Sequence, residues 1–167
     1  TLSLQEAEEL ISNYNIDKLP TVIVKGELNK TNLNSTLSAS GDALIFTSQT
    51  APYYDVLTNS IKGLVVATII TPANCTECTN INPLLDELES NGIIIASATT
   101  ITEEEASDLI QNYNILTLPS LILSSGASEY PELKQICARL GTEETDGSFI
   151  LRNIPPPYKN LTTGQIE

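Results

Sequence analysis

A twelve-residue phrase occurs twice in this chain, and it constrains the fold more than any other feature of the sequence. The copies are NYNIDKLPTVIV, which begins at Asn13, and NYNILTLPSLIL, which begins at Asn112, 99 residues later. Shifting the sequence by 99 positions aligns residues 1–24 with residues 100–123, and 12 of the 24 aligned residues are identical. Chance gives about one or two identities over such a length, so we interpret the match as an internal repeat.

A second match lies further along the chain at a slightly larger offset. The stretch ALIFTSQTAPYYDVLTNSI from Ala43 aligns with SFILRNIPPPYKNLTTGQI from Ser148, 105 residues later. The second copy therefore carries six more residues between the two matches, 105 minus 99. A period of about 100 residues is the length of a small domain and is too long for a solenoid repeat.

The repeat predicts how the chain is divided. We expect residues 1–40 to be the C-terminal half of a preceding unit, residues 41–141 to be one complete unit, and residues 142–167 to be the N-terminal edge of a following unit. The sequence contains no methionine, even at position 1. Together these observations predict a fragment of a larger protein that carries further repeats of the same kind.

Charge and composition exclude several classes of partner and of chemistry. The 167 residues include 21 acidic and 8 basic side chains, which gives a net charge of −13. Such a chain has little with which to neutralise phosphates, so we expect neither nucleic acid nor anionic membrane as a partner. The longest apolar runs fall well short of the roughly 20 residues that cross a bilayer. Histidine is absent, which removes the usual general base and the commonest metal ligand.

The expected complete unit alternates strands with helices. Short apolar or β-branched runs predict strands at residues 43–46, 64–70, 93–98 and 120–124, of which the second and third are expected to be buried. Apolar residues at helical spacing predict helices over residues 74–91, beginning near 102, and over 131–140. Thr102 with Glu105 forms an expected capping box, which Ser3 and Glu6 repeat in the first copy. This alternation is typical of an α/β layer fold.

The motif that carries chemistry is TPANCTEC, in which Cys75 and Cys78 follow a predicted central strand and open a predicted helix. Unpaired backbone N–H groups and the positive end of the dipole at a helix N-terminus stabilise a thiolate. We therefore expect Cys75 to be nucleophilic at neutral pH, with Cys78 one turn later as the resolving thiol.

Two other interpretations of the cysteine pair remain open. One is an inert or structural disulfide, although a bridge between residues three apart closes a very short loop and adds little stability. The other is half a zinc site. Zinc requires four ligands, whereas the chain offers this pair, no histidine and only the distant Cys137. We therefore expect no metal.

At this point the chain resembles the thioredoxin/glutaredoxin superfamily. The likeness rests on three features: a strand–Cys75-x-x-Cys78–helix segment, Pro83 five residues after the second cysteine, and Leu118-Pro119 opening a later strand. The stretch TPANCTEC is most similar to the T-P-x-C-x-x-C of glutaredoxin-like protein disulfide oxidoreductases, which hold two thioredoxin folds in one chain.

The resemblance implies a thioredoxin-like fold over residues 41–141, with a central mixed sheet flanked by helices. It implies that Pro83 kinks the active-site helix, that Pro119 follows a cis peptide bond beside the dithiol, and that a peptide substrate pairs with the backbone of Leu118. The implied activity is thiol–disulfide exchange with protein thiols and disulfides, without a cofactor and with a redox partner protein. The alternative is a non-catalytic tandem scaffold or interaction module of a larger surface protein.

The sequence departs from the family pattern around the cysteines. Asn74 stands where thioredoxins commonly have tryptophan, and an extra residue separates Pro72 from Cys75. No residue matches the buried acid that the family places near the dithiol. The two residues between the cysteines are Thr76 and Glu77, neither of them proline or histidine.

Cys137 lies on the apolar stripe of a predicted helix together with Leu133, Ile136 and Leu140. A buried free cysteine packs as a small hydrophobic residue. We therefore predict a core position for Cys137 and no part in catalysis.

Four N-x-S/T sequons occur, at Asn29, Asn34, Asn74 and Asn160. Such sites suit a secreted or surface protein, although a chain rich in serine, threonine and asparagine acquires some by chance. With the acidity, they favour an extracytoplasmic location, such as the ectodomain of an anchored protein. A glycan on Asn74 would obstruct the adjacent Cys75.

Glu77 leads to a prediction about the redox potential of the pair. Its negative charge beside the cysteines disfavours their ionised form. We therefore expect a reduction potential more negative than the roughly −120 mV of a strongly oxidising dithiol. Equilibration of the chain in glutathione buffers measures this value, and a result as positive as about −120 mV would contradict the prediction.

Overall fold

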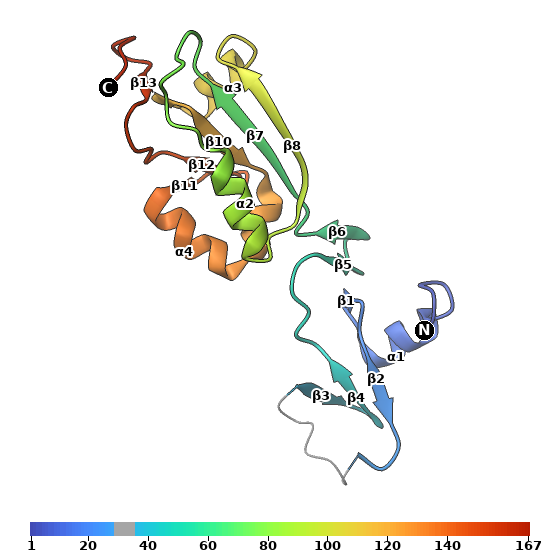
Figure 1. The fold of residues 1–167 in the computed structure, drawn as a ribbon. Coiled ribbons are helices and arrows are strands. Elements are labelled where there is room, and N and C mark those ends of the chain that lie inside the picture. Colours follow the sequence, from blue (N-terminus) through green and yellow to red (C-terminus); the bar gives the residue numbers. More distant parts are fainter. Residues whose placement is uncertain (29–35) are drawn as a thin grey trace. The chain divides into compact units, whose positions relative to one another are not determined.

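The computed structural model describes residues 1–28 and 36–167 (Figure 1). It is a mixed α/β structure with several sheets, and its described residues contain four α-helices. The predicted α/β class is thus confirmed. The chain forms two compact units, Thr1–Lys62 and Gly63–Glu167, which we describe separately. The boundaries near residues 40 and 141 that the sequence led us to expect fall inside these units.

The described residues of the first unit, 1–28 and 36–62, form one α-helix and two small antiparallel sheets. Its elements are α1 (Glu8–Tyr14), β1 (Lys18–Leu19), β2 (Ile23–Lys25), β3 (Leu37–Ser40), β4 (Ala43–Phe46), β5 (Tyr53–Asp55) and β6 (Ser60–Lys62). The sheets have the orders β2-β4-β3 and β1-β5-β6. The small core gathers Tyr14, Ile16, Ala43 and Ile45, so the predicted strand at 43–46 is confirmed and packs with α1.

A five-stranded mixed sheet forms the centre of the second unit (Figure 1). Its strands are β7 (Val65–Thr71), β8 (Ile95–Thr102), β10 (Ser120–Leu123), β11 (Gly141–Glu143) and β12 (Phe149–Leu151), in the order β11-β12-β10-β7-β8. β7 and β8 are parallel, and the other neighbours are antiparallel. The short strands β9 (Thr117–Leu118) and β13 (Lys159–Asn160) form a separate antiparallel pair.

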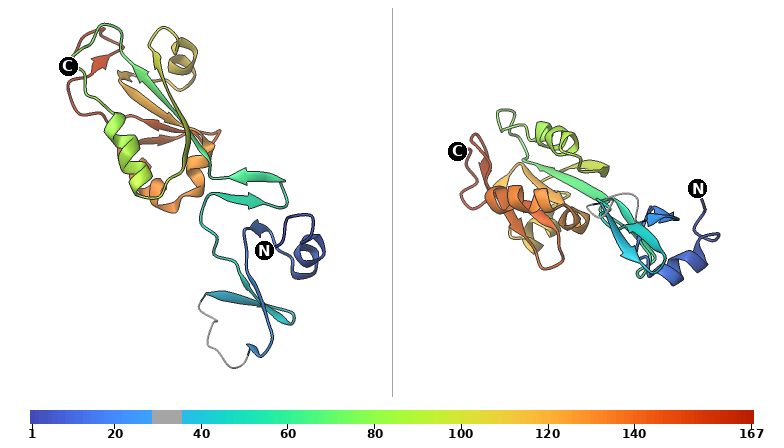
Figure 2. Two further views of the ribbon diagram at one scale, coloured as in Figure 1. Left: turned by 45° about the vertical axis from the view of Figure 1, so that its right-hand side comes forward. Right: turned by 90° about the horizontal axis from the view of Figure 1, so that it is seen from below.

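Helices cover both faces of the five-stranded sheet (Figure 2). They are α2 (Asn82–Ser90), α3 (Ser107–Asn112) and α4 (Pro131–Leu140), with a short 3-10 helix, η2 (Ser125–Glu129), before α4. The α3 segment packs on one face, where Ile70, Ile122 and Ile150 form a common cluster. Side chains alternate along a strand, so the buried Ile69 and Leu121 point to the other face, on which α2 and α4 lie. No helix in the described ranges is long and apolar enough to cross a membrane.

Both predicted capping boxes are present. The backbone N–H and the hydroxyl of Ser3 donate to Glu6 at 2.8 and 2.7 Å. The same groups of Thr102 donate to Glu105 at 2.8 and 2.9 Å. In each box the serine or threonine oxygen accepts the glutamate N–H in return. Each box closes the turn that leads into a helix, whereas α1 and α3 themselves begin at Glu8 and Ser107 without a side-chain cap.

The helix predicted over residues 131–140 is confirmed as α4, with Leu133 and Cys137 buried. The strand predicted at residues 93–98 is shifted and was wrongly expected to be buried. It runs as β8 from Ile95 to Thr102, and most of its residues are exposed. The reason is its position at the edge of the sheet, where β7 is the one strand of the described residues that pairs with it.

Gly141 leads to a prediction about stability. A Cβ atom at this position would lie 1.9 Å from the carbonyl oxygen of Ile150. The substitution Gly141→Ala therefore forces β11 away from β12, and we expect it to lower the free energy of unfolding by about 1–3 kcal/mol. Urea denaturation measures the change, with Ser97→Ala on the exposed β8 as the control. A Gly141→Ala chain as stable as the native one would contradict this expectation.

Candidate functional site

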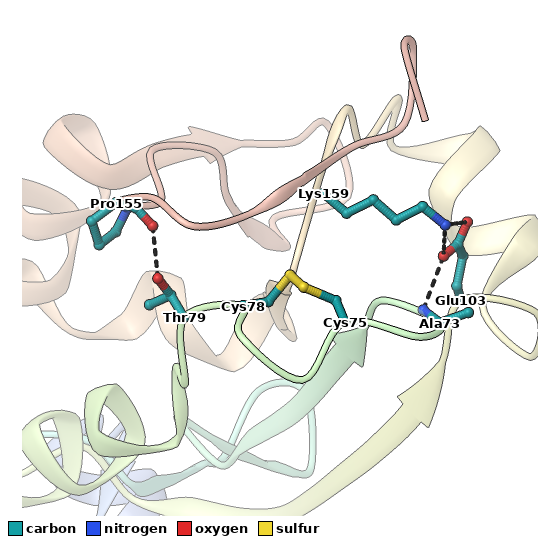
Figure 3. The surroundings of a disulfide bond; sticks show 7 residues. All are labelled: Ala73, Cys75, Cys78, Thr79, Glu103, Pro155 and Lys159. Carbon is teal, nitrogen blue, oxygen red and sulfur yellow. Dashed lines mark hydrogen bonds and ion pairs between the residues drawn. A yellow bond between two sulfur atoms is a disulfide. The ribbon is translucent and has the colours of Figure 1, made fainter. Parts of the chain in front are cut away.

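Cys75 and Cys78 form a disulfide in the loop between β7 and α2 (Figure 3). Their Cα atoms are 5.5 Å apart, and both residues are partly exposed. The disulfide lines a surface hollow of about 210 Å³, and Pro119 lines the same hollow. The two cysteines and the proline that the sequence singled out thus lie together.

The pairing of β10 with β7 explains why Pro119 reaches the cysteine loop. Ser120 lies opposite Ile70 in this antiparallel pair. Pro119 is therefore level with the last residue of β7, where the chain enters the loop. The Leu118–Pro119 peptide bond is cis, as the resemblance implied.

The cysteines do not lie at a helix N-terminus, which corrects the expected helix over residues 74–91. The helix α2 begins only at Asn82. Asn74 has a left-handed backbone with φ +58, and Pro83 has no backbone N–H to donate, so a helix that already ran through residues 79–82 would lose a hydrogen bond there. The side chain of Asn80 accepts the N–H of Asn82 at 3.0 Å, just before the helix. The expected stabilisation of a Cys75 thiolate by the helix dipole therefore does not apply.

The implied kink at Pro83 is also absent. Pro83 is the second residue of α2, where backbone N–H groups have no partner within the helix. Proline at this point costs no hydrogen bond and helps to start the helix. Glu77 is exposed between the cysteines, where its charge faces solvent.

Leu118, the expected substrate contact, is fully buried and belongs to β9. Its backbone is paired with Lys159 of β13, and Thr117 is paired with Asn160. The position at which the resemblance implies that a substrate backbone pairs is therefore occupied by another part of the same unit.

A surface segment, residues 155–160, passes beside the disulfide, and we call it the strap (Figure 3). It is tied to the cysteine loop at Thr79, the residue after Cys78. The Thr79 N–H donates to the carbonyl oxygen of Pro157 at 2.8 Å. The Thr79 hydroxyl donates to the carbonyl oxygen of Pro155, also at 2.8 Å. Both donors of Thr79 are thus used by the strap.

The other flank of the loop is tied to the strap through Glu103. The ammonium of Lys159 lies 2.9 and 2.7 Å from the two carboxylate oxygens of Glu103. One of these oxygens also accepts the backbone N–H of Ala73 at 3.1 Å. Hydrogen bonding from Lys159 holds the pKa of Glu103 below its usual value, against the opposing effect of partial burial. Glu103 therefore links the strap to the loop two residues before Cys75.

The third cysteine lies apart from this site. Cys137 is free, and it is buried on α4. Burial raises the pKa of its thiol to about 11, so the thiolate is scarce at neutral pH. The predicted core position is confirmed.

The remaining candidates are a metal site and the four sequons. Within residues 1–28 and 36–167, no group of three or more His, Cys, Asp or Glu side chains is placed to hold a metal ion. Of the sequons, Asn29 and Asn34 lie outside the described residues, and Asn74 is exposed. The amide of Asn160 donates to Glu167 and accepts from Thr162.

Sequence reasoning did not place Thr79, Glu103 or Lys159 at the site. Each is an ordinary surface residue type, and none belongs to a motif. The only available signal was the position of Lys159 directly after the stretch PPPY, one of the two repeated stretches. Comparison with known proteins found no matching family model, no matching curated protein and no matching solved structure.

The ion pair between Glu103 and Lys159 leads to a prediction about pH. The folded state lowers the pKa of Glu103 from 4.5, so its ionised form contributes stability that is fully present above that value. The contribution is lost as the pH falls through the folded-state pKa. We therefore expect Glu103→Gln to lower the thermal unfolding midpoint at pH 7, and this difference from the native chain to shrink below about pH 4.5.

The matched control is Glu104→Gln, which removes the same charge from an exposed neighbour. Thermal scans between pH 7 and pH 3 compare the three chains. A deficit of Glu103→Gln that stays constant across this range, or that equals the deficit of the control, would rule out the assigned role.

Proposed function

We propose that this chain is a thiol–disulfide oxidoreductase of thioredoxin-like type that acts on protein disulfides through Cys75 and Cys78. One observation carries the proposal. A partly exposed Cys-x-x-Cys disulfide follows the central strand β7 and shares a surface hollow with Pro119. The mixed sheet with helices on both faces supports the same assignment.

The proposed reaction uses only the two cysteines of this chain. The Cys75 thiolate attacks one sulfur of a substrate disulfide, so that a mixed disulfide forms and the other substrate sulfur leaves as a thiolate, which takes up a proton. The Cys78 thiolate then attacks the Cys75 sulfur and releases the second substrate thiol. The substrate has gained two electrons, and the Cys75–Cys78 disulfide has formed. A redox partner protein that supplies two electrons restores the dithiol.

We further propose that the two compact units are versions of one thioredoxin-like unit. In both units a capping box precedes a helix, and a cis Leu-Pro bond follows it, at Leu19–Pro20 and at Leu118–Pro119. In both units a later segment pairs with that leucine: Tyr54 lies opposite Leu19, and Lys159 lies opposite Leu118. Tyr54 and Lys159 are 105 residues apart, which is the offset of the second sequence match.

The alternative is a non-catalytic tandem scaffold or interaction module. One observation favours it: the edge of Leu118, next to the disulfide, is already paired with Lys159. The first unit has the same pairing, although residues 1–62 contain no cysteine. Because the first unit has this pairing of its leucine but no dithiol, the pairing contributes to the fold of the unit independently of any redox chemistry.

Insulin reduction separates the two functions. We expect the full chain to accelerate the precipitation of insulin by dithiothreitol, because each turnover passes electrons through the cysteine pair. Cys75→Ser and Cys78→Ser should return the rate to that of dithiothreitol alone. Cys137→Ser is the control and should retain the acceleration, because Cys137 is buried away from the site.

A second readout supports the interpretation of this assay. At pH 6 the reduced native chain should react with iodoacetamide mainly at Cys75, because a nucleophilic cysteine retains thiolate at that pH. Slow labelling of Cys75, together with an insulin rate equal to that of dithiothreitol alone, would exclude the enzyme and favour the scaffold.

A further inference from the structure

We infer that the strap, residues 155–160, is a built-in gate that occupies the peptide-binding edge beside the Cys75–Cys78 disulfide and must leave before a polypeptide can react there. The inference rests on the proposed function in one respect, since it assigns a mode of regulation to the same site. Its test follows the disulfide itself, so it does not depend on whether the chain turns over a substrate.

The strand edge nearest to the disulfide is already occupied by the strap. A polypeptide that reaches the hollow in an extended conformation would pair with the nearest free strand edge, as in strand addition. The strand next to the disulfide is β9, directly before Pro119. Its edge is taken by β13, with Lys159 opposite Leu118. An incoming polypeptide and the strap therefore compete for the same backbone groups.

The strap is fastened on both flanks of the cysteine loop. Thr79 on one side binds two strap carbonyl groups, and on the other side Glu103 joins Lys159 to Ala73 (Figure 3). The disulfide lies between the two fastenings in this view. A polypeptide approaching from the strap side therefore meets the strap before it meets the sulfur atoms.

The contacts that hold the strap to the cysteine loop are few and non-covalent, so they can break and form again. Pro155, Pro156 and Pro157 have no N–H to donate and are exposed, so the first half of the strap adds no donors of its own. Buried Ile154 precedes the strap, and the Leu161 N–H, which donates to the carbonyl oxygen of Leu116 at 2.8 Å, follows it. Tyr158 and Asn160 of the strap also pair with Glu167 and Gln165. Lifting the strap between its two fixed ends therefore breaks this small pairing and that of β9 with β13, but no bond within the five-stranded sheet.

The first unit shows that the strap belongs to the fold. There β5 pairs with β1, and Tyr54 lies opposite Leu19. A segment that closes the corresponding edge in both units is not a loosely attached tail. The segment is a regular part of each unit, and in the second unit it lies beside a disulfide.

The test measures reduction of the Cys75–Cys78 disulfide by thiols of two sizes. Dithiothreitol attacks one sulfur through its thiolate, the S–S bond breaks, and the second dithiothreitol thiol releases the reduced protein. The protein gains two electrons and two protons, and dithiothreitol becomes a cyclic disulfide. The larger probe is a ten-residue peptide with one cysteine, of which two molecules are consumed and joined by a disulfide. The readout is the ratio of the peptide rate to the dithiothreitol rate.

Two variants loosen the strap without touching the cysteines. Thr79→Val removes one hydroxyl donor and no charge, and Lys159→Met removes the ion pair but keeps the side-chain length. If polypeptides react only when the strap is open, their rate follows the open fraction. We expect the peptide rate to rise about fivefold for Thr79→Val, about threefold for Lys159→Met, and at least about tenfold for the double variant. The dithiothreitol rate should change less than about twofold, because the disulfide is partly exposed with the strap closed.

Lys134→Met on the exposed surface of α4 is the control for charge. Faster hydrogen exchange of the backbone amide at position 79 shows that the strap is looser, since that N–H is bound to Pro157. Slow exchange of the amides in β7 and β10 shows that the variants remain folded. Unchanged rate ratios in folded variants with faster Thr79 exchange would overturn the inference, as would an equal rise for both probes. A double variant that raises the peptide ratio but leaves the insulin rate equal to that of dithiothreitol alone would overturn the proposed enzyme and leave the gate intact.

Discussion

The antiparallel pairing of β10 with β7 is the constraint on which the candidate site depends. It sets Ser120 opposite Ile70, and from this register the placement of Pro119 beside the cysteine loop follows directly. Ile70 is fully buried, within the cluster on which α3 packs. A slip of one residue would turn Ile70 away from this cluster to the opposite face of the sheet and bring Ile69 into its place. Core packing thus holds the proline and the disulfide at one edge of the sheet.

The sequence predicted the parts of this structure that depend on local chemistry. Thr102 and Glu105 are three residues apart, so their capping box can be read from the chain, and the spacing of Leu133 and Cys137 identifies one face of α4 in the same way. The exposure of β8 could not be predicted, because small and β-branched residues suit an edge strand as well as a central one. The hydrogen bond from Thr79 to Pro155 joins residues 76 positions apart, and no sequence pattern near either residue indicates it.

The late start of α2 connects the fold with the proposed chemistry. Without a helix N-terminus at Cys75, a thiolate there would depend on neighbouring charges and on individual hydrogen-bond donors. The nearest charge between the cysteines is the acidic Glu77, and the nearby ammonium of Lys159 is already paired with Glu103. These surroundings differ from the helix N-terminus that the sequence led us to expect at Cys75. They also place the strap, which carries Lys159, among the elements that set the electrostatics of the site.

The position of β13 in the chain has a mechanical consequence. The strap follows β12, the last strand of the five-stranded sheet along the chain, and is followed by residues 161–167. A pulling force on residues 161–167 would reach the bond of Leu161 to Leu116 and the two-residue pairing of β9 with β13 before it reached the central sheet. A two-residue strand pairing can break one hydrogen bond at a time, whereas the five-stranded sheet and the helices packed on it unfold together. Tension along the polypeptide would therefore uncover the disulfide while the rest of the unit stayed folded.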